Sequence, residues 1–519
     1  MARKSKPKPL YTGSGADWDF DLIKRTTDAI EEIALGEMKL DVYPNQIEII
    51  TSEQMLDAYS SIGMPLMYQH WSFGKHFLTD EKMYRKGYQG LAYEIVINSS
   101  PCISYLMEEN TMTLQALVIA HAAFGHNHFF KNNYLFQQWT DAEGILDYLK
   151  FAKDYIADCE QRYGTAEVEQ ILDSCHAIMD QGVDRYRRPS KLSAAKERER
   201  QEARAEEAQR SYNDLWNRTV PKDKGVTFTT ADLLDELSGR TERQKLLKLP
   251  EENLLYFIEK KSPTLKPWER EIVRIVRKIA QYFYPQKQTK VANEGFATYT
   301  HYHIMYRLWD KGLIDNAAML EFLHVHTAVV RQPEFHERGF SGLNPYHLGF
   351  EMMQDIRRIA EHPTDEDREW FPDWAGSGDG HAKVLEAVAN YRDESFIQQF
   401  LSPHLIRKLR LFQITDDNKT EFYEVAAIHD DQGYKNIRNS LAQSYNLSAN
   451  EPDIQVVDVD LLGSRTLSLR HTQYKGIPMD EGTTEEVLKH VGSLWGYSVR
   501  FTAVEADSGD EVSELTLRR

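Results

Sequence analysis

The 519-residue chain has no long apolar segment, few cysteines and no excess of positive charge. No run of about 18 apolar residues occurs, so no segment is expected to span a bilayer. Three cysteines in so long a chain argue for a reducing compartment and against a disulfide framework, and the lack of Cys-x-x-Cys spacing excludes a zinc knuckle. The basic residues 1–9 are not followed by the apolar stretch of a signal peptide. We therefore expect a cytoplasmic protein whose cysteines pack in its core.

The negative net charge argues against binding to nucleic acid or to an anionic membrane. The net charge is −18 at pH 7, and the acidic residues are spread along the chain. Nonspecific binding to nucleic acid or to an anionic membrane needs clustered lysines and arginines, so neither is expected. Residues 376–380 (Gly-Ser-Gly-Asp-Gly) lack both the preceding strand and the following Lys-Ser/Thr of a phosphate-binding loop, and we interpret them as an ordinary loop.

Hydrophobic residues make up 41% of the chain, which is enough for a folded core, and the length predicts more than one domain. We expect a mainly α protein with a small C-terminal α+β domain. The pattern divides the chain into a disordered tail (1–16), the first part of a helical domain (17–186), a charged linker (187–248), the second part of the helical domain (249–410), the α+β domain (411–506) and a second tail (507–519).

Both parts of the helical domain show the 3.6-residue period of helices. Residues 92–97 are the one extended interruption in the first part and predict a strand. Charges of both signs alternate over 187–210, which is typical of a solvated helix or a flexible arm. The clearest helices are predicted at 112–124, 272–283 (ending before Pro285), 291–309, 316–330 and 345–360.

The order strand-strand-helix is predicted twice in the last hundred residues, at a spacing of about 40 residues. This weak duplication predicts a small α+β domain without a catalytic cluster, suited to regulation or partner binding. The first unit has strands at 411–415 and 422–428 and a helix at 434–445; the second has strands at 454–461 and 466–473, a helix at 484–494 and a closing strand at 498–504.

Nine of the 18 histidines fall in two windows, 121–128 and 301–347. Imidazole is the commonest transition-metal ligand near neutral pH, so such clustering can indicate a metal site. In the first window, Leu114, Leu117, Val118 and His121 share one apolar helix face, so His121 is expected to point inward.

The sequence Asn-Glu-Gly-Phe-Ala at residues 293–297 resembles a motif of the M1 (gluzincin) aminopeptidases, in which the glutamate is the third zinc ligand. On a helix from residue 291, Glu294 lies on a largely apolar stripe, with His301 only about 20° away around the axis. A carboxylate on a core-facing stripe is costly unless a cation or hydrogen-bond donors compensate it. A metal bound by His121, His126, Glu294 and His301, zinc in the first place, would do so.

The chain departs from the His-Glu-x-x-His pattern of those peptidases. His121 and His126 are five residues apart, which on a regular α-helix separates them by about 140°. A π-bulge between them would restore a common face; alternatively, Gly125 could end the helix and let His126 turn back. Ala122 stands where the base glutamate is expected, so Glu94, Glu108 and Glu109 are the candidate bases. His324 is a candidate orienting residue, whereas His326 is expected to point elsewhere. The alternative for any single histidine is an ordinary hydrogen-bonded core residue.

Several further segments resemble the stage V sporulation protein R (SpoVR) family, and the similarity runs from about residue 18 to 495. Besides both histidine segments, they are 50–55 (Ile-Thr-Ser-Glu-Gln-Met), 57–61 (Asp-Ala-Tyr-Ser-Ser), 70–75 (His-Trp-Ser-Phe-Gly-Lys), 91–98 (Leu-Ala-Tyr-Glu-Ile-Val-Ile-Asn), 106–111 (Leu-Met-Glu-Glu-Asn-Thr), 129–136 (Phe-Phe-Lys-Asn-Asn-Tyr-Leu-Phe) and 284–289 (Tyr-Pro-Gln-Lys-Gln-Thr). The resemblance implies a link to spore cortex formation in spore-formers. In other bacteria it implies association with a PrkA-type serine kinase and a von Willebrand A-like protein in stress or stationary-phase physiology.

Two functions follow from these expectations. The first is a zinc-dependent hydrolase acting on a peptide or peptidoglycan-related amide, with a glutamate from elsewhere in the chain as base. The second is a non-catalytic regulator that keeps a structural metal or a polar histidine core and acts with the kinase through its C-terminal domain. The missing base glutamate favours the regulator, and the inward-facing Glu294 motif favours the hydrolase.

Overall fold

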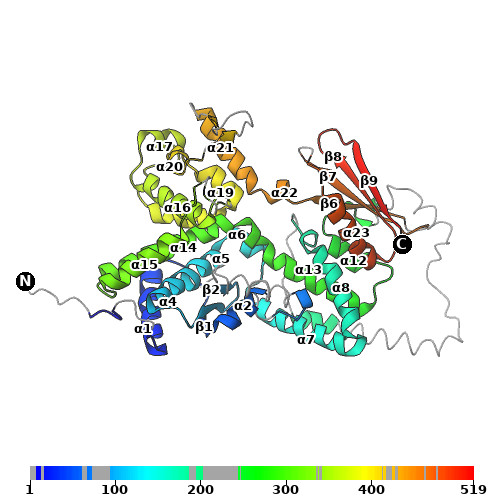
Figure 1. The fold of residues 1–519 in the computed structure, drawn as a ribbon, viewed down its shortest axis with the longest axis horizontal. Helices are drawn as coiled ribbons and strands as arrows, with labels where there is room; N and C mark the ends of the chain where they lie inside the picture. The colour runs from blue at the N-terminus through cyan, green and yellow to red at the C-terminus, as the bar shows by residue number, and fades with distance from the viewer. Residues whose placement is uncertain are drawn as a thin grey trace, which may run out of the picture. The chain divides into compact units, whose positions relative to one another are not determined.

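The computed structural model describes most of the chain (Figure 1). It divides into two compact units: unit 1 (1–65, 72–138 and 285–447) and unit 2 (66–71, 139–284 and 448–519). The residues described are 8–12, 17–60, 67–72, 94–185, 194–200, 202, 244–245, 247–334, 337, 340, 342–411, 413–415, 424–426, 431–460, 463–474 and 477–518.

Unit 1 is mainly helical, as expected. The predicted helices at 291–309, 316–330 and 345–360 are confirmed within one or two residues. Its helices are α1 (Phe20–Glu31), η1 (Glu32–Glu37), α2 (Ser52–Ser60), α4 (Met112–Ile119), η2 (Ala120–His126), α5 (Asn127–Asn132), most of α6 (Tyr134–Trp139), α14 (Lys290–Asp310), α15 (Asn316–Val329), α16 (Pro345–Glu361), α17 (Asp365–Trp370), α18 (Gly380–Asn390), α19 (Asp393–Phe400), α20 (Pro403–Lys408) and α21 (Asp431–Ser444).

A three-stranded sheet in unit 1 has the order β1-β3-β2. Strand β3 (Cys102–Met107) pairs in parallel with β1 (Asn45–Ile50) and antiparallel with β2 (Glu94–Ile97). The prediction of one extended interruption is therefore wrong, because it finds only β2. The other two strands gave no clear signal: β3 is buried along most of its length and does not alternate, so it resembles a buried helical segment in sequence.

Helix α14 lies beside α4, α5 and α16 in the core of unit 1 (Figure 1). Two close helix contacts depend on glycine. A Cβ at Gly125 of η2 would lie 2.6 Å from Cα of Ala297 in α14. A Cβ at Gly295 would likewise clash with the backbone of Gly349 in α16. These glycines let α14 approach η2 and α16 backbone to backbone, which fixes the position of the α14 side chains relative to η2.

Unit 2 combines helices with a four-stranded sheet. The helices are α7 (Ile145–Tyr163), α8 (Thr165–Ala177), η3 (Met179–Gln181), α12 (Leu254–Lys261), α13 (Pro267–Gln288), α22 (Leu447–Asn450) and α23 (Glu481–Trp495). Helix α13 continues past Pro285, so the predicted stop before that proline is wrong. A proline removes one helical hydrogen bond, and the surrounding packing keeps the helix continuous here.

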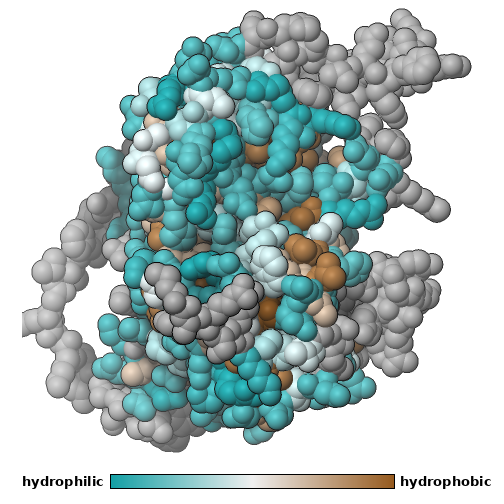
Figure 2. All heavy atoms as spheres, turned by 90° about the vertical axis from the view of Figure 1, so that its left-hand side faces the viewer, coloured by the Kyte–Doolittle hydropathy of each residue, from teal (hydrophilic) through white to brown (hydrophobic). Residues whose placement is uncertain are grey.

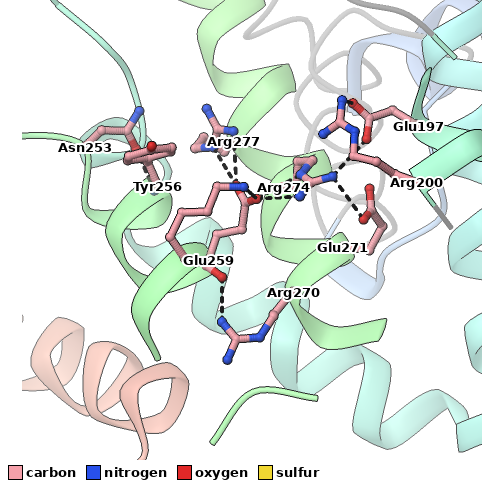
Figure 3. A network of polar contacts seen from close by, with 10 residues as sticks. Glu197, Arg200, Asn253, Tyr256, Glu259, Arg270, Glu271, Arg274 and Arg277 are labelled. Atoms are coloured by element: carbon pink, nitrogen blue, oxygen red, sulfur yellow. Dashed lines mark hydrogen bonds and ion pairs between the residues drawn. The ribbon is translucent and has the colours of Figure 1, made fainter. Parts of the chain in front are cut away.

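A buried ion-pair network joins α12 and α13 (Figure 3). Arg274 contacts Glu259 at 2.8 Å and Glu197 at 3.0 Å, and Arg277 contacts Glu259 at 3.1 Å. Burial raises the pKa of the Glu259 carboxyl, but the two arginines outweigh it and lower that pKa to about 2. Glu197 belongs to the predicted linker 187–248, of which few residues are described; residues 194–200 are helical, and Glu197 is buried instead of solvated.

The sheet of unit 2 has the order β6-β7-β8-β9. Strands β7 (Leu467–Gln473) and β8 (Val499–Glu505) are parallel and joined through α23, while β6 (Asp453–Val459) and β9 (Glu511–Leu517) pair antiparallel at the edges. The prediction of a tail at 507–519 is wrong, because β9 occupies 511–517. Most of β9 is exposed and polar, so it lacks the half-buried alternation that would predict a strand.

Strands β4 (Gln413–Thr415) and β5 (Glu424–Ala426) pair with each other and precede α21, so the strand-strand-helix order does occur twice. The C-terminal α+β character is confirmed. Residues 411–447 group with unit 1 and 448–519 with unit 2. That 411–506 fold as a separate domain stays a prediction.

The N-terminal tail is ordered in part. The backbone N–H of Leu10 donates to the carbonyl of Leu313 at 2.8 Å, and Tyr11 is buried beside Ile314. The prediction of a disordered tail over 1–16 is therefore wrong for residues 8–12, because an aromatic ring fills a place in the core.

The three cysteines are buried free thiols, as predicted. Burial raises the pKa of Cys102 to about 12 and that of Cys159 to about 11, so neither thiol ionises near neutral pH. No described helix is both long and apolar enough to cross a bilayer. Hydrophilic residues cover most of the face in Figure 2, with apolar residues in small areas.

Candidate metal centre

A turn of π-helix brings His121 and His126 to the same side. Both histidines lie on η2, and their ring centroids are 4.7 Å apart. A π-helical turn has more residues than an α-helical turn, so an i, i+5 pair shares a face. Of the two geometries that the sequence left open, the π-bulge is the one found. Helix α4, η2 and α5 follow one another without a break, and Gly125 does not end the helix.

Glu294 of α14 faces this pair. Its Oε2 atom lies 3.6 Å from Nε2 of His121 and 3.4 Å from Nε2 of His126. The contact between Gly125 and Ala297 lets the two helices approach closely enough for these side chains to meet. Three of the four side chains that the sequence analysis selected as ligands, His121, His126 and Glu294, therefore converge at one place in unit 1.

Of the three candidate bases, only Glu94 lies at this place. Its Oε1 atom is 3.3 Å from Nε2 of His121, at the start of β2. Glu108 and Glu109 are exposed on the turn after β3, and Glu109 accepts the backbone N–H of Ser52 at 3.3 Å. The reason is that β3 ends at Met107, so both glutamates follow its end and face away from the buried histidines.

Two polar atoms of the cluster are buried without a hydrogen-bond partner: Nε2 of His121 and Oε2 of Glu294. Ligand atoms of Glu94, His121 and His126 also lie within 4.8 Å of one another, and within the described residues this is the one such group of three or more potential ligands. Two imidazole nitrogens and a carboxylate oxygen are donors that zinc and related divalent ions prefer. The carboxylate side chains remain 18% exposed, so the cluster is not sealed from solvent.

Asn293 orients the ring of His126. Its Oδ1 atom lies 2.9 Å from Nδ1 of His126. An amide oxygen can only accept, so Nδ1 carries the proton and donates it. In the neutral ring the free lone pair is then on Nε2, which faces Glu294. An outer partner that fixes the tautomer in this way is characteristic of metal-binding histidines.

His301 and His326 extend the cluster away from the carboxylates. Nδ1 of His301 lies 2.9 Å from Nδ1 of His121, and Nε2 of His301 lies 2.9 Å from Nδ1 of His326. His301 therefore contacts the candidate ligand His121 at Nδ1, behind the ring nitrogen Nε2 that faces Glu294. This row of three rings ends among Tyr302, Phe322 and Phe350, which surround His326.

The placement predicted for His324 and His326 is wrong, because the two are reversed. His324 is exposed, and His326 is buried against His301. The buried stripe of α15 is formed by Ala318, Met319, Phe322 and His326. The prediction used the side of Leu320 and Leu323, but Leu320 is 69% exposed.

Burial and neighbouring charges shift the pKa values of the cluster in different directions. Burial raises the pKa of the Glu94 carboxyl. Burial would also raise the pKa of Glu294, but His126 and His121 outweigh it and hold that pKa below its usual range. Burial opposes the charge on His126, yet the Glu294 carboxylate raises its pKa to about 9. Without a metal, Glu294 and His126 therefore form an ion pair.

Burial lowers the pKa values of His301 and His326, the two histidines farther along the row. Burial, followed by the neighbouring histidines, holds the pKa of His301 well below its usual value. Burial lowers the pKa of His326 to about 4. Both rings are thus neutral at pH 7, which is the state in which a row of imidazoles can pass hydrogen bonds from one ring to the next.

Asp393 of α19 holds the start of α14. Its carboxylate accepts the backbone N–H of Val291 and of Ala292, each at 2.9 Å. These N–H groups have no partner within the helix, so a buried carboxylate there fixes the segment that carries Asn293 and Glu294. Sequence reasoning missed this residue because no local pattern connects positions a hundred residues apart.

Comparison with known proteins finds the SpoVR family over nearly the whole chain, as the resemblance in sequence predicted. Residues 17–450 match the family model described as SpoVR like protein, and residues 452–506 match the SpoVR-like C-terminal domain. The chain is 54% identical over 500 residues to the uncharacterized protein YcgB of Escherichia coli K12, covering 96% of this chain and 95% of that protein. No solved structure matches.

Proposed function

The chain belongs to the SpoVR family, and we propose that it binds a divalent transition metal, zinc first, through His121, His126 and Glu294. The observation that carries this proposal is a pair of buried atoms that make no hydrogen bond, Nε2 of His121 and Oε2 of Glu294, which lie 3.6 Å apart. Their other polar contacts, to Glu94 and His126, are long, at 3.3 and 3.4 Å. Burying such an atom without a hydrogen bond costs about 1–3 kcal/mol, and a shared cation reduces that cost.

We propose further that the site hydrolyses an amide bond of a peptide or a peptidoglycan-related substrate. A bound zinc ion would polarise the carbonyl of the amide and lower the pKa of a water molecule that it binds. His121 and His126 would bind through Nε2, and Glu294 through its carboxylate, which matches the two-histidine, one-glutamate set of catalytic zinc sites. With Glu294 as the third ligand, we assign the role of base to Glu94, because its Oε1 lies 3.3 Å from Nε2 of His121 and burial raises its pKa.

Protein groups outside the ligand set prepare these roles. Asn293 fixes the tautomer of His126, and His301 supplies a hydrogen-bond partner for Nδ1 of His121. A proton on Nδ1 of His121 makes that ring the donor to His301, whose Nε2–H then donates to His326. Burial keeps the Glu94 carboxyl closer to neutrality, which suits a residue that takes and returns a proton.

The direct test is metal analysis of the protein purified from zinc-supplemented medium, followed by assay of peptide and muropeptide amides. We expect roughly one zinc ion per chain and amide cleavage that a chelator abolishes. The Glu294→Gln variant should retain no tightly bound metal. A wild-type protein that takes up no divalent metal would end the proposal.

A second candidate is a non-catalytic regulator that acts with a PrkA-type serine kinase and a von Willebrand A-like protein, in stress, stationary-phase or sporulation physiology. The observation that favours it is Ala122, which stands where a zinc peptidase has its base glutamate. In that case metal binding persists, amide cleavage is absent, and the purified kinase binds the chain. For either function we propose a cytoplasmic location, from the low cysteine count.

A further inference from the structure

In unit 1, at the contact between α21 and the end of α17, lies a guanidinium that has no carboxylate partner among the residues described. Arg438 of α21 stacks on Trp370, with its guanidinium carbon 4.7 Å from the ring centroid, and lies 5.5 Å from the centroid of Phe371. Its Nε atom donates to the carbonyl of Leu401 at 2.8 Å. Its Nη2 atom is buried and has no hydrogen-bond partner.

Two other arginines of this unit, the partly buried Arg358 and the exposed Arg407, are paired. Arg358 contacts Asp355 and Asp367, and Arg407 contacts Glu366. Within the described part of the chain, no ion pair joins Arg438 to a carboxylate. Burial accordingly lowers the pKa of Arg438 to about 10, with no acidic group acting against it. A cation removed from water without a counter-charge is unfavourable, so this side chain is poised for an anion.

Lys435 places a second cation at the same ring. It precedes Arg438 by three residues on α21, which puts both on one helix face, and its Nζ lies 5.8 Å from the Trp370 centroid. Lys435 is exposed, and it too has no ion-pair partner among the residues described. In a chain of net charge −18, two cations at one ring without an acidic partner among the residues described indicate a site for an anion.

We propose that Lys435 and Arg438, held against Trp370, form a binding site for an oxyanion, the carboxylate or phosphate group of a ligand. A guanidinium offers a planar fork of donors that fits two oxygens of such a group, and the lysine adds a point charge. Trp370 holds the guanidinium in place, which reduces the conformational entropy lost on binding. This site is separate from the histidine–glutamate cluster and does not depend on the proposed metal.

The alternative is that stacking alone explains Arg438, with the cation–π contact fixing α21 to α17. Both readings predict that loss of Arg438 destabilises the protein, so stability alone does not separate them. They differ in the response to anions. An oxyanion site saturates with the anion it binds, whereas a structural stack responds only to ionic strength.

The test is the melting temperature of the full-length protein against potassium phosphate, potassium acetate and potassium chloride at constant ionic strength. We expect a saturable rise of a few degrees with phosphate or acetate and none with chloride. A response to phosphate alone assigns the site to phosphoryl groups, and one to acetate assigns it to carboxylates. The Glu294→Gln variant should respond as wild type does.

Three variants decide where the anion binds. Arg438→Gln should abolish the response, and Lys435→Gln, an exposed change that leaves the fold intact, should raise the half-saturating concentration several-fold. Arg407→Gln is the matched control, because Arg407 stacks on neighbouring Tyr434 but is already paired with Glu366. No saturable response in wild type, or the same response in Lys435→Gln as in wild type, would overturn the proposal.

Discussion

The Nδ1 atoms of His121 and His301 lie 2.9 Å apart, although 180 residues separate the two histidines. Two imidazole nitrogens at this distance share one proton, so one ring donates and the other accepts. If His121 binds a metal through Nε2, its Nδ1 carries the proton, and Nδ1 of His301 accepts it in a hydrogen bond. Hydrogen bonds from His121 to His301 and from His301 to His326 thus connect the tautomer of the candidate ligand His121 with those of the other two rings.

This relationship predicts the effect of removing His301. The His301→Phe variant should bind zinc about 10–100-fold more weakly than wild type, since losing an outer partner of a ligand histidine typically costs that much. The measurement is competition with a chromophoric zinc chelator. His324→Phe is the control, because His324 is exposed on α15 and should have no effect. Equal zinc affinity in His301→Phe and wild type would contradict the role of His301 as hydrogen-bond partner of the ligand His121.

The close contact at Gly125 predicts a steric penalty. In Gly125→Ala the new Cβ would meet Cα of Ala297 at 2.6 Å and push η2 away from α14. We expect a loss of roughly 1–3 kcal/mol in the free energy of unfolding, together with weaker metal binding. Gly36→Ala is the control, since Gly36 also lies on a π-helical turn and a Cβ there meets nothing within 4 Å. Similar denaturant midpoints for the two variants would argue against the close approach.

A substitution at Glu94 distinguishes its role as base from a role as metal ligand. If Glu94 is the base, Glu94→Gln should keep its zinc and lose amide hydrolysis by a factor of about 10²–10⁴. Zinc content and turnover are measured on the same preparation. Loss of the metal itself would instead make Glu94 a fourth ligand and remove the hydrolytic mechanism as written.

Asp393 predicts a pH dependence of stability. Burial raises its pKa from 3.8 to about 7 in the folded protein, despite the N–H groups of Val291 and Ala292 that favour the anion. Between about pH 4 and pH 7 the unfolded chain loses this proton and the folded chain keeps it, so the Asp393 contribution to stability falls as pH rises. A shift of this size corresponds to at most about 4 kcal/mol over the window.

The Asp393→Asn variant lacks this titration. Its melting temperature should therefore improve relative to wild type as pH rises from 5 to 8. A difference that stays constant across that range would show that Asp393 is already ionised in the folded state at pH 5.

Part of the fold and of the site could be predicted from local sequence. The period of 3.6 residues located α14, α15 and α16 closely, because long amphipathic helices repeat their signal over several turns. His121, His126 and Glu294 could be selected because each lies on or beside an apolar stripe where a polar group needs a partner. The i, i+5 spacing gave the π-helical turn as one of two possible geometries, beside a helix end at Gly125.

What local sequence missed depends on tertiary contacts. His326 and His324 are two residues apart on one helix, and only packing against His301 decides which one is buried. Glu94 was one of three candidates until the end of β3 placed Glu108 and Glu109 at the surface. Asp393 gives no signal at all, because its partners are backbone N–H groups of a distant helix.

The central claim is that His121, His126 and Glu294 hold one metal ion, and elemental analysis tests it most directly. Wild type, Glu294→Gln and the exposed control Glu108→Gln are purified in parallel from zinc-supplemented medium, and circular dichroism verifies that all three are folded. We expect about one zinc ion per chain in wild type and in Glu108→Gln, and almost none in Glu294→Gln. Equal metal content in all three proteins, or no metal in wild type, would contradict the claim.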